Sequence, residues 1–87
     1  MPNTHRETPE YAAMLSRMVR AYGRRLADSD PSDLADAVRI MAELDAAIAQ
    51  AVDGLRATHG FSWADIAAEL GITRQAAQQR YGRRIAS

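Results

Sequence analysis

The 87-residue chain contains no cysteine, and this absence narrows what can stabilise it. Without thiols, neither disulfide bonds nor a thiolate-based metal site can reinforce the fold. A chain of this length buries only about 60 to 65% of its unfolded surface, which leaves a single domain marginally stable. Oligomerisation is a common remedy for so small a core.

Long apolar runs are also absent. The first eight residues are polar, and no apolar stretch approaches the roughly 18 residues of a membrane helix. We therefore expect no signal peptide, no membrane span and a cytoplasmic protein.

Groups suited to catalysis are scarce. The two histidines are His5, in a polar tail, and His59, at an expected helix end, and no glycine-rich phosphate loop occurs. His5, Glu7 and Glu10 form a loose set of metal donors, but a flexible tail is a poor ligand cage. The sequence predicts no enzyme, no catalytic residue, no metal and no cofactor.

Lysine is missing too, since all eleven basic residues are arginine. This bias can reflect a GC-rich genome, so it does not count as evidence for phosphate binding. The net charge of zero argues weakly against a protein that relies on non-specific attraction to DNA. The charges are nevertheless segregated along the chain. The net charge is +3 over residues 1–27, −6 over residues 28–53 and +3 over residues 54–87.

An amphipathic helix is predicted to begin at Thr8-Pro9-Glu10, where a capping hydroxyl precedes a proline and an acid. Its apolar face is formed by Tyr11, Leu15, Met18, Tyr22 and Leu26, and is widened by Met14 and Val19. Three arginines, Arg17, Arg20 and Arg24, lie off this face. We interpret them as a solvated surface rather than as a nucleic-acid contact.

A second, longer helix is predicted over residues 31–58, with Asp30 as its cap and Pro31 at its start. Leu34, Met41, Ile48 and Leu55 recur every seven residues and form a heptad stripe together with Ala37, Leu44 and Ala51. The polar residues expected on the opposite side are Asp36, Arg39, Glu43, Gln50, Asp53 and Arg56.

Apolar residues flank the heptad stripe on both sides, Val38 and Val52 on one and Ile40 and Ala47 on the other. A helix this broadly apolar usually contacts two neighbours. The first is expected to be the preceding helix, folded back as an antiparallel hairpin. The second is either the C-terminal segment or the same helix of another subunit.

Residues 61–70 carry the signals of a helix start. Ser62 can cap the helix, and Asp65 stands three residues later, as in a capping box. Phe61 and Ile66 occupy the positions of a hydrophobic staple.

Residues 70–84 continue with a tight turn and another helix. Gly71 follows Leu70 at a position that favours the left-handed conformation. Thr73 can cap a further helix over Arg74–Arg84.

The stretch S-W-A-D-I-A-x-x-L-G-I-T-R-Q-A-A resembles a helix-turn-helix DNA-binding motif. The matching buried or turn positions are Ile66, Ala67, Leu70, Gly71, Ile72 and Ala77. The order of residues in this stretch is most similar to the sigma-factor region-4-like type of actinobacteria and their phages. Many members carry an apolar residue three after the position of Ala77. Arg80 stands there in this chain, so we expect Tyr81 to take over its packing role.

The resemblance implies that the N-terminal half of the second helix enters the major groove of double-stranded DNA. The outward positions there are Thr73, Arg74, Gln75, Gln78 and Gln79. Their chemistry fits independently, because arginine bonds bidentately to guanine and glutamine to adenine, and this helix has no acid.

Other residues have two interpretations each. Ser62 and Thr73 are caps that can also bind phosphate. Arg83 and Arg84 can reach the DNA backbone, and Arg80 either pairs with Asp65 or Glu69 or binds phosphate. Trp63 is expected in the core rather than as a stacking platform.

The sequence thus predicts an all-α protein with a helical hairpin over residues 1–60 and a helix-turn-helix over residues 61–87, together forming one compact domain. The predicted function is a dimeric, nucleoid-associated transcriptional regulator. Its expected dimer interface comprises Ile40, Leu44, Ala47, Ile48 and Ala51. The alternative is an adaptor for RNA polymerase or a regulator. It would use the same scaffold without reading DNA, with the acidic helix 31–58 as a partner surface.

Overall fold

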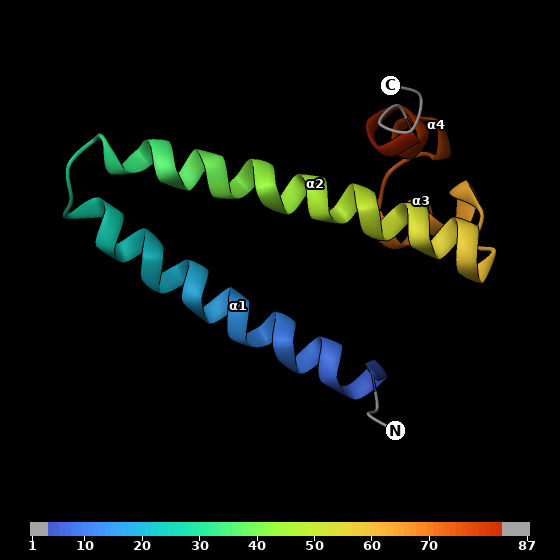
Figure 1. Ribbon diagram of the computed structural model, residues 1–87, viewed down its shortest axis with the longest axis horizontal. Helices are drawn as coiled ribbons and strands as arrows, with labels where there is room; N and C mark the ends of the chain where they lie inside the picture. Colours follow the sequence, from blue (N-terminus) through green and yellow to red (C-terminus); the bar gives the residue numbers. More distant parts are fainter. Residues whose placement is uncertain (1–3, 83–87) are drawn as a thin grey trace. The chain divides into compact units, whose positions relative to one another are not determined.

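The computed structural model describes residues 4–82, which are helical apart from short turns (Figure 1). The elements are α1 (Thr4–Ala27), α2 (Asp33–His59), α3 (Trp63–Leu70), α4 (Arg74–Ala77) and the π-helical turn η1 (Gln78–Gly82). No strand occurs in this range, which confirms the all-α class. None of these helices is long and apolar enough to cross a membrane.

The chain divides into two compact units between Val38 and Arg39, inside α2. The predicted boundary at residue 60 does not coincide with this division. The two differ because Ala49 and Val52, in the C-terminal part of α2, belong to the same core as Ile66 and Tyr81 of the following elements.

In the first unit, α1 begins at Thr4, four residues before the predicted cap at Thr8. Pro9 therefore lies inside the helix instead of opening it. Its fixed φ suits a helix, but its missing N–H removes the bond to the carbonyl of residue 5, and its ring crowds the same carbonyl near the helix end. The prediction that the helix starts at Thr8 is therefore wrong.

The turn after α1 is closed by short-range hydrogen bonds. The N–H of Ser32 donates to Asp30 Oδ1 at 2.9 Å, so the Asp30 side chain closes the turn two residues ahead of it. Regular helix begins at Asp33 rather than at Pro31, because the N–H groups of Asp33 and Leu34 reach back only three residues, to Asp30 and Pro31.

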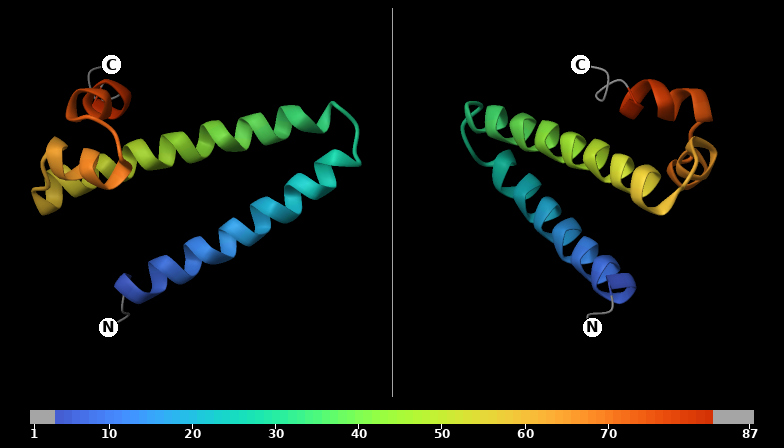
Figure 2. Two further views of the ribbon diagram at one scale, coloured as in Figure 1. Left: turned by 180° about the vertical axis from the view of Figure 1, so that it is seen from behind. Right: turned by 45° about the vertical axis from the view of Figure 1, so that its right-hand side comes forward.

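The second unit is built around a small apolar core. Its buried residues are Ala49 and Val52 of α2, Ile66 and Ala67 of α3, Ala77 of α4 and Tyr81 of η1. Ile48 and Trp63 pack against this cluster and remain partly exposed. Both views of Figure 2 show α3 beside the C-terminal end of α2. One of the two predicted neighbours of α2 is therefore the C-terminal segment.

The face of α2 that is buried here differs from the predicted heptad stripe. Ala49 and Val52 form its centre, and Asp53 and Arg56, both expected on the polar side, are half-buried. The guanidinium of Arg56 lies 4.4 Å from the centre of the Trp63 ring, so a cation–π contact helps to draw this side of α2 towards α3.

Helix ends in the second unit follow the predicted signals. Gly71 has φ 70°, and its N–H and that of Ile72 both donate to the carbonyl of Ala67. This pattern satisfies a carbonyl at the end of α3 and turns the chain towards α4. Gly60, with φ 72°, ends α2 in the same left-handed conformation.

Tyr81 takes the packing role that the sequence predicts for it. It is 4% exposed, whereas Arg80 is exposed. The helix that starts at Arg74 continues through the π-helical turn of η1, which holds one more residue per turn than an α-helix. Tyr81, four residues after the buried Ala77, lies within this wider turn.

Replacing Tyr81 by Ala should lower the free energy of unfolding by about 3 kcal/mol, because it removes a buried aromatic ring. Arg80→Ala should cost less than about 1 kcal/mol, since its side chain is exposed. Urea denaturation followed by circular dichroism measures both. Tyr81→Phe keeps the ring and serves as the control, and equal effects of the two alanine variants would contradict the packing of Tyr81.

Candidate nucleic-acid interface

The helix formed by α4 and η1 has one buried and one exposed side. Ala77 is 0% exposed and Tyr81 is buried four residues later, so both face the core. The remaining predicted base-contacting residues, Arg74, Gln75, Gln78 and Gln79, are all exposed. The packing therefore brings these four side chains onto the surface of one short helical segment.

Thr73 caps this segment as predicted. Its Oγ1 accepts the N–H of Ala76 at 3.0 Å. A hydroxyl oxygen that accepts a hydrogen bond can still donate its own proton, so the cap leaves Thr73 able to contact a phosphate. Thr73 is exposed.

Ser62 and Asp65 form the predicted capping box at the start of α3. The N–H of Asp65 donates to Ser62 Oγ at 3.1 Å, and the N–H of Ser62 donates to Asp65 Oδ2 at 2.9 Å. The carboxylate thus occupies the site that a phosphate would need, and it carries the same charge. This makes Ser62 a weaker candidate for a phosphate contact than Thr73.

Arg80 pairs with an acid that the sequence did not indicate. Its Nη2 lies 3.4 Å from Oδ1 of Asp45 in α2, instead of near Asp65 or Glu69. The guanidinium also lies 5.5 Å from the centre of the Tyr81 ring. Because the Arg80 side chain is 62% exposed, this ion pair is weak and can exchange with a phosphate.

Trp63 is partly buried and packs against the core, as expected. The Arg56 guanidinium covers one part of its ring, and a Cβ added to Gly82 would lie 3.2 Å from its Cζ2 atom. Both neighbours leave little room for a stacked base. The sequence does not predict this contact of Arg56, because an arginine seven residues before a tryptophan is not a distinctive pattern.

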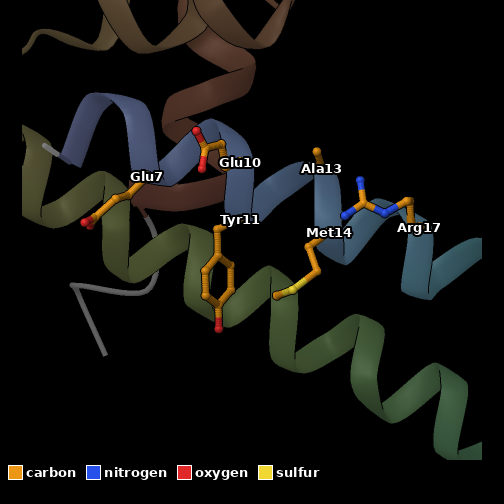
Figure 3. A pocket seen from close by; sticks show the side chains of 6 residues that line it. All are labelled: Glu7, Glu10, Tyr11, Ala13, Met14 and Arg17. Atoms are coloured by element: carbon orange, nitrogen blue, oxygen red, sulfur yellow. The ribbon is translucent and has the colours of Figure 1, made fainter.

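The two remaining predicted phosphate contacts, Arg83 and Arg84, lie outside the described residues. Within residues 4–82 no group of three or more histidine or acidic side chains is placed to hold a metal ion. A shallow hollow on α1 is lined by two acids, an arginine and three uncharged residues (Figure 3): Glu7, Glu10, Tyr11, Ala13, Met14 and Arg17. It contains none of the predicted DNA-contacting residues.

Comparison with known proteins gives no match: no family model, no curated protein and no solved structure is similar to this chain.

The capping box should make stability depend on pH. The hydrogen bond from the Ser62 backbone, and then that from its side chain, hold the pKa of Asp65 below its ordinary value of about 4. A carboxyl whose pKa is lowered by folding stabilises the fold in full above its unfolded pKa, and this contribution is lost as pH falls through the folded pKa.

Asp65→Asn should therefore lower the melting temperature near pH 7, and the difference from the wild type should shrink below about pH 4. Thermal unfolding at a series of pH values measures this. Glu69→Gln removes a carboxylate from the same helix without touching the cap and should have little effect. A difference that persists unchanged in acid would exclude the charge of Asp65 as the cause.

Proposed function

We propose that the chain is a small sequence-specific DNA-binding protein in which α3, the turn at Gly71 and α4 form a helix-turn-helix. The observation that carries this proposal is the division of the α4–η1 segment into two sides. Burial of Ala77 and Tyr81 turns Arg74, Gln75, Gln78 and Gln79 outwards together. In this proposal the start of that segment enters the major groove.

The exposed side chains have the chemistry for reading base edges. An arginine can form two hydrogen bonds to guanine, and a glutamine amide can do the same with adenine. No acid occurs between Gly71 and Gly82, so nothing in this segment repels phosphate. Surface glutamines alone would add solubility less effectively than acids do.

The proposed architecture places an antiparallel helical hairpin before the helix-turn-helix. Apolar side chains of α1 and of the heptad stripe, including Met18, Val19, Met41 and Leu44, are exposed. Such surfaces need partners in a stable protein. A hairpin and an interface with a second chain together supply them.

The proposed form is a homodimer, with an interface that includes Ile40, Leu44, Ala47, Ile48 and Ala51. All but Ile48 are exposed, and Ile48 is half-buried. One short helix-turn-helix makes few phosphate contacts, whereas two linked copies gain affinity through effective concentration. A two-fold dimer would read half-sites about 34 Å apart in a nearly palindromic sequence.

A mobility shift with random duplex DNA at low and moderate salt tests the proposal against the adaptor alternative. Binding that weakens with salt supports DNA recognition, because phosphate contacts release counterions. Absence of binding at any salt supports the adaptor. Selection from random DNA then identifies the site.

Arg74→Ala and Gln75→Ala should each weaken binding to the selected site by about 1–3 kcal/mol, while binding to random DNA changes much less. Fluorescence anisotropy with both duplexes measures the two affinities. Arg39→Ala, which removes the same charge from α2, is the control for Arg74. Equal losses on both duplexes would show that these side chains do not read bases.

Ile40→Glu should convert the dimer into a monomer, because it places a charge in the apolar interface. Light scattering measures the mass of the wild type and the variant. Gln50→Glu adds the same carboxylate at an exposed position of α2 outside the interface and should leave the dimer intact. A wild type that remains monomeric at high micromolar concentration would refute the dimer and the palindromic site.

A further inference from the structure

The ion pair between Arg80 and Asp45 joins the segment proposed to bind DNA to α2. Nη2 of Arg80 lies 3.4 Å from Oδ1 of Asp45, although the two residues are thirty-five positions apart in sequence. Asp45 stands four residues before Ala49, and Arg80 directly precedes Tyr81. Because Ala49 and Tyr81 belong to one buried cluster, the core itself brings these two charges together.

Arg80 carries half of the positive charge in the segment proposed to bind DNA. Within residues 71–82 the basic residues are Arg74 and Arg80, and there is no acid. Asp45 belongs to the stretch 28–53, whose net charge is −6. The ion pair therefore offsets one of two cations with a carboxylate from outside the segment.

A DNA phosphate at Arg80 would compete with the carboxylate of Asp45 for the same guanidinium. Two anions beside one cation repel each other, so the phosphate gains most when Asp45 gives way. The side chains of Arg80 and Asp45 are 62% and 37% exposed, and solvent weakens their attraction. Duplex DNA carries about one phosphate charge per 1.7 Å of its axis and offers Arg80 the stronger field.

We infer that Asp45 holds Arg80 in the unbound protein and is displaced from it by a DNA phosphate, so that this carboxylate limits the strength of DNA binding. Binding then includes the cost of breaking the Arg80–Asp45 pair and of bringing the phosphate backbone close to Asp45. The inference rests on the DNA binding of the proposed function. It adds a residue of α2 that acts through Arg80 without touching DNA.

Asp45→Asn should tighten binding to random duplex DNA by about two- to five-fold, in the range that an exposed ion pair supplies. The amide keeps the size of the side chain and removes its charge. Fluorescence anisotropy at low salt measures the Kd of the full-length wild type and variant. The selected duplex should gain by a similar factor, because a phosphate contact carries no sequence information.

Two matched variants control for charge and for side-chain size. Glu43→Gln removes the same charge from α2, but Glu43 pairs with Arg39 at 3.0 Å and not with the DNA-binding segment. Its effect on Kd should be much smaller. Asp45→Glu keeps the carboxylate and should retain the Kd of the wild type.

A double-mutant cycle separates an action through Arg80 from a structural role of Asp45. Arg80→Ala should weaken binding and lower the salt slope by about one, because a phosphate contact is lost. In the Arg80→Ala background, Asp45→Asn should change Kd no more than Glu43→Gln does. If Asp45 acts on the fold alone, its effect on Kd persists without Arg80.

The outcomes distinguish a failure of this inference from a failure of the proposed function. If the wild type binds DNA and Asp45→Asn binds no more tightly than Glu43→Gln, the inference is overturned and DNA binding stands. The same conclusion follows if the gain persists in full after Arg80→Ala, or if Arg80→Ala leaves the salt slope unchanged. Absence of binding by both the wild type and Asp45→Asn at any salt overturns both.

Discussion

The burial of Ala77 and Tyr81 is the constraint on which the rest of the second unit depends. Ala77 has no exposed surface, so the side of α4 that carries it faces the core. Tyr81 packs into the same cluster as Val52 and Ile66. These contacts fix the rotation of the helix about its axis, and that rotation decides which of its side chains are exposed.

Two surfaces of the second unit differ in charge. The exposed side of α4 carries an arginine and a glutamine without any acid, whereas the hollow between the C-terminal half of α2 and α3 is lined by Asp65 and Glu69. A net charge of zero is therefore compatible with DNA binding, because charges of opposite sign lie on different surfaces. The small core also gives a physical reason for association, since apolar residues such as Phe61 and Leu70 are exposed on the second unit.

The sequence predicted local features of the fold and site more successfully than it predicted packing. The Ser62–Asp65 capping box and the left-handed Gly71 are each determined by a few neighbouring residues, and both predictions are confirmed. The buried side of α2 depends instead on where α3 packs. The heptad pattern holds no information on the contact between Arg56 and Trp63, so Arg56 was wrongly placed on the polar side. The partner of Arg80 was missed for the same reason, because Asp45 lies thirty-five residues away in sequence.

The π-helical turn at Gln78–Gly82 has a consequence for how the chain tolerates changes in length. A π turn contains one residue more than the α-helical turn it replaces, so it is equivalent to an insertion already accommodated within a helix. Deletion of a single residue usually rotates everything beyond it out of register. Loss of Gln79 would instead allow a regular α-helical turn and place the tyrosine three residues after Ala77, still on the same side of the helix. The end of this helix is therefore a position where one residue can be lost while the buried ring keeps its place.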